Sequence, residues 1–144
     1  MVTFVLDASA VLRYLDGEEG VDRVREIIKL HIAAHAHVVV SAIQWGEIHG
    51  VLFKRHSPGT AQAAIGRLTA FDFELIPATP ERAVRAAAIK IKRKIPYADA
   101  FAVELAGDSK YHILVTADFD VKPAKTDIAI EFLPKKTVIA SDDR

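Results

Sequence analysis

Residues 2–7 read Val-Thr-Phe-Val-Leu-Asp, an uninterrupted run of β-prone side chains that ends in a carboxylate. Such a run predicts a strand that is buried on both faces, as in a parallel sheet covered by helices. Residues 111–115 form a second β-prone run, and Asp118 follows it after a short turn. Open α/β sheets bind ligands beyond the carboxyl ends of their strands. We therefore expect Asp7 and Asp118 on the rim where such sheets carry their chemistry.

The rest of the chain alternates helical and strand patterns. Helices are predicted over residues 9–17, 18–35, 41–55, 58–68, 79–95 and 98–108, and further strands over residues 38–40, 71–75 and 128–133. Ser41 and Gln44 form the S-x-x-Q pattern of a capping box at the start of the third helix. The alternation predicts an α/β fold, with a central parallel sheet and helices on both faces. We expect this fold to form a single domain over residues 1–140, followed by a disordered tail over residues 141–144.

The composition is that of a folded protein. Of 144 residues, 51% are hydrophobic and 26% are charged, which excludes a disordered chain. Basic and acidic residues balance at 19 each, so the total charge does not indicate nucleic-acid binding. The absence of cysteine excludes disulfides, thiolate zinc sites and cysteine nucleophiles. We see neither a signal peptide nor an apolar run of the ~20 residues that a membrane span needs, and we expect a cytoplasmic protein.

Several acidic residues are candidates for a site, and each also has a structural interpretation. Asp7 could cap the helix that follows it. Glu47 lies within a predicted helix, where glutamate is favoured on any exposed face. Asp99 lies in the first turn of its helix, where the macrodipole favours a carboxylate. Asp118 and Asp120 lie in a turn-like segment, where aspartate is common.

The ordered set is more informative than its members. Leu6-Asp7-Ala8-Ser9-Ala10, then Glu47 in the helix after the second strand, then Tyr97-Ala98-Asp99-Ala100, then Val115-Thr116-Ala117-Asp118 resembles the PIN-domain nucleases. The likeness is closest to VapC-type toxins of VapBC toxin–antitoxin pairs, and it covers nearly the whole chain. It implies a PIN-like fold in which Asp7, Glu47, Asp99 and Asp118 hold Mg²⁺ or Mn²⁺. Ser9 and Thr116 match hydroxyl positions beside that site, and Asp120 is either a fifth acid or a turn residue.

The resemblance implies a metal-dependent endoribonuclease. Clustered carboxylates repel one another, and a divalent cation with oxygen ligands relieves that repulsion. Water bound to the cation can then attack phosphorus. The sequence leaves open whether one or two ions bind. The implied partners are RNA, a second copy of the chain in a homodimer, and a small antitoxin whose C-terminal segment covers the cleft. Trp45 and Leu12 would contact that segment, or else belong to the core.

Basic and histidine residues offer weaker signals. Arg82, Arg85, Lys92 and Arg93 share one face of the helix over residues 79–95, opposite Val84, Ala87, Ala88 and Ile91. Because this helix ends just before Asp99, its basic face and Arg13 are candidates for RNA phosphate contacts. The alternative is an ordinary solvated face. His31 and His35 have the spacing of a helical metal site, with His37 nearby, but no clear third ligand accompanies them.

Individual residues exclude two other classes of α/β protein. A receiver-like domain needs an acidic pair at the first strand, and only Asp7 is present. A haloacid-dehalogenase-type phosphatase needs an aspartate two residues after its nucleophile, where this chain has Ser9. Two alternatives stay open. One is a non-catalytic PIN-like module that binds RNA or protein, and the other is a solitary RNA-processing nuclease without an antitoxin.

Overall fold

Five short parallel strands form a single sheet in the computed structural model, which describes residues 1–137. They are β1 (Thr3–Leu6), β2 (His37–Ser41), β3 (Glu74–Ile76), β4 (His112–Thr116) and β5 (Ala129–Phe132), in the order β3-β2-β1-β4-β5. The predicted central parallel sheet is therefore confirmed. The predicted domain boundary at residue 140 and the tail over residues 141–144 lie outside the described residues.

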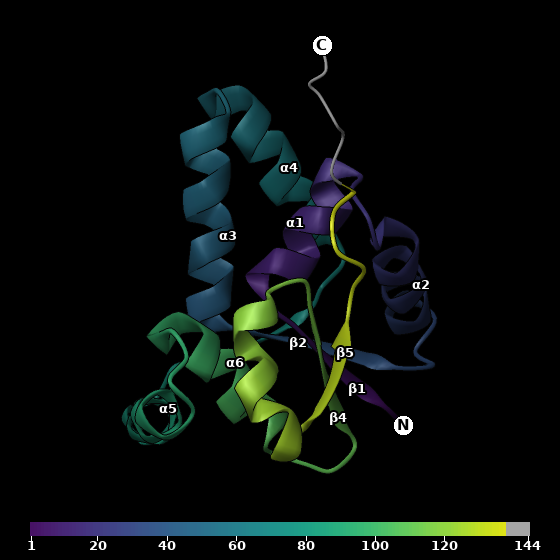
Figure 1. Cartoon of the computed structure of the whole chain (residues 1–144). Helices are drawn as coiled ribbons and strands as arrows, with labels where there is room; N and C mark the ends of the chain where they lie inside the picture. The colour runs from purple at the N-terminus through teal and green to yellow at the C-terminus, as the bar shows by residue number, and fades with distance from the viewer. Residues whose placement is uncertain (138–144) are drawn as a thin grey trace.

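Helices cover both faces of this sheet, as predicted (Figure 1). One face packs against α1 (Ala8–Asp16), α2 (Val21–Ile32), α3 (Ala42–Arg55) and α4 (Pro58–Ala70), and the other against α5 (Pro80–Arg93), α6 (Tyr97–Ala106) and the 3₁₀ helix η1 (Phe119–Thr126). Successive strand residues point to opposite faces. In β1, Phe4 and Leu6 accordingly enter the first core and Val5 the second.

The order of the strands reverses between β1 and β4. From β1 the chain moves outward through β2 to β3, and it then returns to place β4 on the other side of β1. Leu6 is in register with Val115, and the Asp7 amide donates to the Val115 carbonyl at 3.4 Å. The residues that follow β1 and β4 therefore leave the sheet side by side, at the kind of switch point where α/β sheets bind ligands.

Two segments differ from the sequence-based expectation. The strand predicted over residues 71–75 is shorter and begins later, because Phe71 ends α4 and Asp72 turns the chain with a φ of 57°. Only Glu74–Ile76 pairs, at the sheet edge beside β2. The 3₁₀ helix η1 was not predicted. Its sequence lacks an apolar period and contains Pro123, so helical periodicity gave no signal for it.

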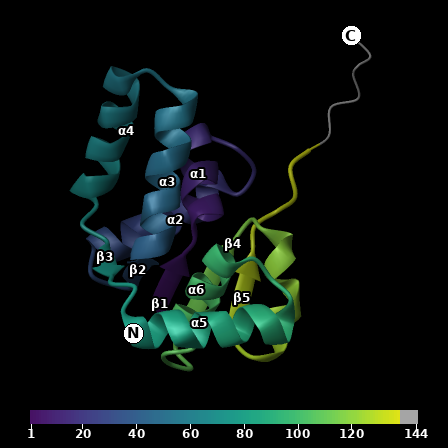
Figure 2. The same ribbon diagram turned by 90° about the vertical axis from the view of Figure 1, so that its left-hand side faces the viewer.

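Figure 2 shows how α3, α4 and α5 are placed around the sheet. α5 lies along the outer side of α6, and α3 and α4 form a hairpin that rises away from the sheet. Among residues 1–137, no helix is both long and apolar enough to cross a membrane.

Candidate active site

Asp7 lies directly after β1 and is almost fully buried, with 2% of its surface exposed. As the N-cap of α1 it accepts a hydrogen bond from the Ala10 amide at 3.0 Å. Ser9 Oγ donates to Asp7 Oδ1 at 2.7 Å, and Thr116 Oγ1 donates to Asp7 Oδ2. Both carboxylate oxygens therefore have donors, which is the condition for holding a charge in a buried place.

The hydroxyls of Ser9 and Thr116 also join the ends of β1 and β4. Ser9 Oγ accepts from the Ala117 amide at 2.8 Å, and Thr116 Oγ1 accepts from the Asp118 amide at 2.9 Å. Asp118 then begins η1 by accepting from the Asp120 amide at 2.9 Å. The two hydroxyls thus fix the position of Asp7 relative to Asp118.

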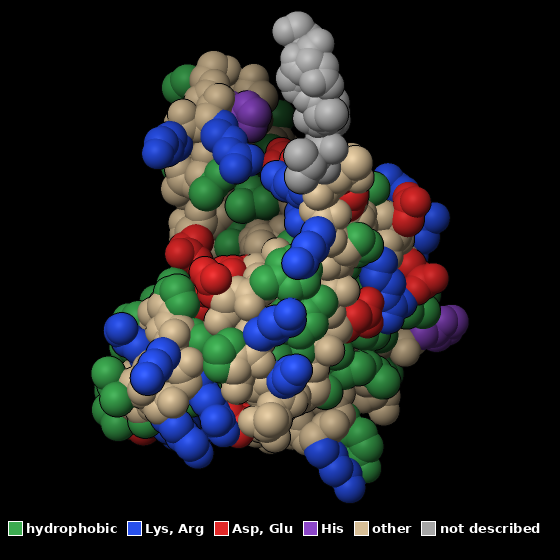
Figure 3. All heavy atoms as spheres, in the orientation of Figure 1, with side chains coloured by type: hydrophobic (Ala, Val, Ile, Leu, Met, Phe, Trp, Pro, Cys, Tyr) green, Lys and Arg blue, Asp and Glu red, His purple; other side chains and the backbone are tan. Residues whose placement is uncertain are grey.

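Asp99 and Glu47 reach the same place from two helices. Asp99 lies in the first turn of α6, is half-buried and is hydrogen-bonded to the carboxyl group of Asp118. Such a bond between two carboxyl groups requires a proton. Glu47 lies on an exposed side of α3, close enough for its charge to act on Asp99. Figure 3 shows acidic side chains gathered at one end of α3, with Lys and Arg side chains around them.

Burial and mutual repulsion alter the titration of these acids. Burial raises the pKa of Asp7 to about 6, against the opposing effect of its hydrogen bonds from Thr116 and Ser9. Burial raises the pKa of Asp99 to about 8, and the hydrogen bond and charge of Asp118 add to this, as do the charges of Asp7 and Glu47. The pKa of Glu47 is raised by burial of its carboxyl group and by Asp118. The four predicted acids therefore act on one another.

Their chemistry suits a hard divalent cation, although the side chains do not converge fully. Within residues 1–137, no three Asp, Glu or His side chains stand close enough together to hold a metal ion. The donor set is nevertheless all oxygen, and its members repel one another, which is the condition that Mg²⁺ or Mn²⁺ relieves. To bind one ion, the four acids would have to draw together around it.

Asp120 lies at the exposed edge of the site. Its amide caps onto Asp118, and its carboxylate does not contribute to the raised pKa of Asp7, Glu47 or Asp99. This placement suits a turn residue better than a fifth acid of the cluster.

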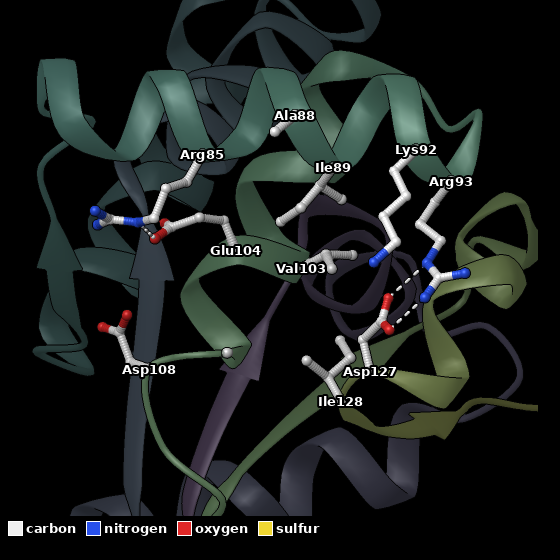
Figure 4. Close-up of a pocket in the computed structure, with 11 residues that line it drawn as sticks. Arg85, Ala88, Ile89, Lys92, Arg93, Val103, Glu104, Asp108, Asp127 and Ile128 are labelled. Atoms are coloured by element: carbon white, nitrogen blue, oxygen red, sulfur yellow. Dashed lines mark hydrogen bonds and ion pairs between the residues drawn. The ribbon is translucent and has the colours of Figure 1, made fainter.

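The candidate phosphate-binding residues are mostly engaged within the chain. Glu104, with 6% of its surface exposed, accepts from Arg82 Nη1 and Arg85 Nε at 2.9 Å, and Arg82 also pairs with Asp108. Arg93 pairs with Asp127 at 2.5 Å. The buried Arg13 guanidinium donates to two backbone carbonyls. Lys92 alone of the five forms no hydrogen bond or ion pair with residues 1–137 (Figure 4).

The helix α5 turns the small or apolar side chains of Ala83, Ala86 and Ile89 toward the core. Its other apolar side chains lie in solvent, with Val84 71% and Ile91 74% exposed. On the basic side of α5, buried Glu104 and the neighbouring Asp108 and Asp127 form ion pairs with the candidate arginines.

Two of the cavities lie beside candidate site residues. One of about 340 Å³ adjoins the acids and is lined by Ser9, Leu12, Arg13, Asp16, Glu18, Arg55, Ala117, Asp118, Phe119 and Lys136. A larger one of about 450 Å³, between α5, α6 and the end of η1, contains none of the four predicted acids (Figure 4). Because the expected chemistry requires the acids, the cavity of about 340 Å³, which Asp118 lines, is the candidate substrate cavity.

Gln44 contacts the site segments in a way that sequence reasoning missed. Ser41 caps α3 through the Ile43 amide, but the Gln44 side chain does not return to complete a capping box. Its Oε1 instead accepts from the Ala8 amide, and its Nε2 donates to the Ala98 carbonyl, both at 2.7 Å. The S-x-x-Q pattern pointed to a local role and carried no signal for these distant contacts.

The histidines form no metal site among the described residues. His31 Nδ1 accepts from the Val38 amide at 3.0 Å, which leaves Nε2 to donate to the Asp72 carbonyl at 3.1 Å. His35 is exposed, and His37 pairs with Glu74. His31 therefore joins α2 to β2 and the turn before β3.

The raised pKa values predict how stability depends on pH. A carboxyl group whose pKa is raised by folding stabilises the fold when protonated, and this contribution is lost as the pH rises through the folded-state pKa. For Asp99 the loss should extend from about pH 4 to about pH 8. We expect the metal-free wild type to lose roughly 1–3 kcal/mol more stability between pH 6 and pH 9 than Asp99→Asn does, because the variant has no carboxyl group to ionise at this position.

Urea unfolding with a chelator at the two pH values measures this difference. Asp22→Asn, which removes an exposed carboxylate on α2, is the matched control and should follow the wild type. Equal pH dependence of Asp99→Asn and wild type would contradict the repulsive cluster.

Comparison with known proteins agrees with this geometry. The PIN domain model matches residues 4–126. No curated protein gives a significant match. Among solved structures, VapBC2 from Rickettsia felis bound to promoter DNA matches with a TM-score of 0.73 and 13% identity, over 92% of this chain and 99% of the matched chain. DNA-bound VapBC from Salmonella typhimurium gives 0.69 and 18%, over 92% and 98%.

A third similar structure is that of a toxin–antitoxin system. VapBC-5 from Mycobacterium tuberculosis, a member of the VapBC family of toxin–antitoxin systems, matches with a TM-score of 0.60 and 16% identity, over 92% of this chain and 98% of the matched chain. At these identities the structural matches establish a common fold. Together with the match over residues 4–126, they show that this chain belongs to the PIN domain family.

Proposed function

We propose that this protein is a Mg²⁺- or Mn²⁺-dependent endoribonuclease that hydrolyses RNA phosphodiester bonds, and that it is the toxin of a toxin–antitoxin pair. One observation carries the nuclease proposal. Acids that follow β1 and β4, together with acids on α3 and α6, lie near the switch point of the sheet, and the charge of Asp118 contributes to the raised pKa of Asp7, Glu47 and Asp99. Membership of the PIN domain family supports the same chemistry.

In this proposal Asp7, Glu47, Asp99 and Asp118 hold the cation. When bound, a divalent cation supplies a polarised water and neutralises charge that develops on the phosphate. The chain's own contribution is to hold the ligands in place and, at Asp7, to offset part of the cost of its charge. Ser9, Thr116 and the Ala10 amide donate to Asp7 and favour its charged form despite burial.

Replacement of single acids tests the nuclease proposal. Asp7→Asn and Asp99→Asn should each lower RNA cleavage by at least about 100-fold, because each removes a charge that holds the cation. Asp120→Asn, a neighbouring exposed aspartate, is the matched control and should cleave nearly as well as wild type. Cleavage is measured with Mg²⁺ or Mn²⁺, and a chelator should abolish it.

Two outcomes would count against the proposal. Unchanged cleavage by a pure Asp7→Asn protein would overturn the assigned site. RNA binding without cleavage by the metal-loaded wild type would favour the alternative, a non-catalytic PIN-like module.

The toxin proposal rests on the similarity in fold to solved VapBC complexes. The antitoxin segment would enter the cavity of about 340 Å³, where Leu12 and Phe119 offer apolar contacts beside Asp118. A basic side chain of that segment would pair with the acids and compete with the cation. Trp45 lines a different pocket with Phe73 and Leu75, so it is not part of this cavity.

Expression in cells tests the toxin proposal. We expect growth arrest by the chain alone, no arrest by Asp7→Asn, and relief when a neighbouring antitoxin gene is coexpressed and its product binds. A chain that is harmless, cleaves RNA in vitro and binds no neighbour's product would instead be a solitary RNA-processing nuclease.

The exposed apolar face of α5 supports the proposed homodimer. Two antiparallel copies of α5 centred between Ala87 and Ala88 would place Val84 of one copy beside Ile91 of the other, with small side chains at the crossing. The same arrangement brings Glu81 near Lys94, so the face is complementary to itself, as a twofold interface requires.

Charge substitution on this face tests the dimer. Val84→Asp and Ile91→Asp should each shift the protein from dimer to monomer in light scattering after gel filtration, because each buries an unpaired charge in the interface. Ile32→Asp, at a 63% exposed position on α2, is the matched control and should leave the dimer intact. A dimer unaffected by all three would place the interface elsewhere.

A further inference from the structure

Gln44 lies on α3 one turn before Glu47, and only 1% of its surface is exposed. Its two amide atoms are both engaged, Oε1 by the Ala8 amide and Nε2 by the Ala98 carbonyl, each at 2.7 Å. Because the first partner can only donate and the second can only accept, the orientation of the Gln44 amide is fixed.

These contacts link three segments that carry acids. Ala8 follows Asp7 directly, Ala98 precedes Asp99 directly, and Gln44 shares α3 with Glu47. In sequence the two bonds span 36 and 54 residues, so they do not serve local helix capping. One side chain thus ties the start of α1, the start of α6 and the body of α3 together beside the cluster.

A polar residue at this place needs an explanation. The neighbouring buried positions on the same face of α3, Ile48 and Leu52, are apolar. A buried amide costs free energy unless its hydrogen bonds are complete, and an apolar side chain of similar size would fill the volume without that condition. The acids repel one another and tend to separate their segments, whereas an uncharged amide can join the segments without adding to the repulsion.

We propose that Gln44 is a positioning residue that limits how far the segments carrying Asp7, Glu47 and Asp99 can separate, so that these acids can draw together around a divalent cation. This rests on the proposed metal-dependent function and adds to it. The amide would act through the backbone of Ala8 and Ala98 and touch neither the cation nor the substrate. Outer contacts that orient metal ligands typically affect metal affinity by about 10–100-fold.

Binding of Mn²⁺ alone tests this role without reference to activity. Gln44→Met keeps the volume and removes both hydrogen bonds, and it should weaken Mn²⁺ binding by about 10–100-fold in isothermal titration. It should also speed hydrogen exchange at the Ala8 amide, whose hydrogen-bond partner is Gln44. Ile48→Val, one turn along the same buried face, is the matched control, since it lowers stability but should leave Mn²⁺ affinity and Ala8 exchange unchanged.

The possible outcomes distinguish the positioning role of Gln44 from the proposed metal site. Faster Ala8 exchange with Mn²⁺ affinity within about twofold of wild type would overturn the positioning role and leave the nuclease proposal standing. Absence of Mn²⁺ binding by the wild type itself would overturn the proposed metal site, and this inference with it. If Gln44→Met does not fold, the shorter Gln44→Asn, which keeps the amide but not its reach, takes its place with the same expected loss.

Discussion

The Asp7 carboxylate is 2% exposed, yet the proposed chemistry needs it charged. An ion in such a place is costly unless donors surround it. The chain provides an amide at the start of α1 and hydroxyls from Ser9 and Thr116. Those hydroxyls in turn accept from the amides after β4. The group that must be stabilised is therefore also the group around which the ends of β1 and β4 are fixed.

The topology explains why so many acids meet there. β1 and β4 are parallel neighbours, so the residues after them leave the same edge of the sheet. α3 begins directly after β2 at that edge, and α6 packs across β1, β2 and β4. Because the acids meet at this edge, negative charge is concentrated there, and the repulsion between the acids opposes folding. Uncharged links such as Gln44 hold the segments at the site, and a cation is the partner that would remove the remaining repulsion.

Much of this could be read from the sequence because it depends on local patterns. Buried strands are continuous β-prone runs, and Asp7 and Asp118 closely follow two of them, so the place of these two acids at the edge could be expected. Three features could not. The contacts of Gln44 join residues far apart in sequence. η1 lacks a helical period. The amphipathic pattern of α5 defines a basic side but does not say that the buried Glu104 pairs with it.

The ion-paired arginines of α5 affect how an anionic substrate could approach. Arg82, Arg85 and Arg93 are held by Glu104, Asp108 and Asp127, so contact with a phosphate would first break an existing pair. The whole chain has no net charge to attract RNA. Near the acids, Lys135 lies over the Phe119 ring at 5.3 Å, and Lys136 pairs with Glu18. At the acids themselves the chain's own side chains are negative, so a bound cation would supply the attraction for a phosphate at that point. On the proposed function, one ion would therefore both complete the fold of the site and recruit its substrate.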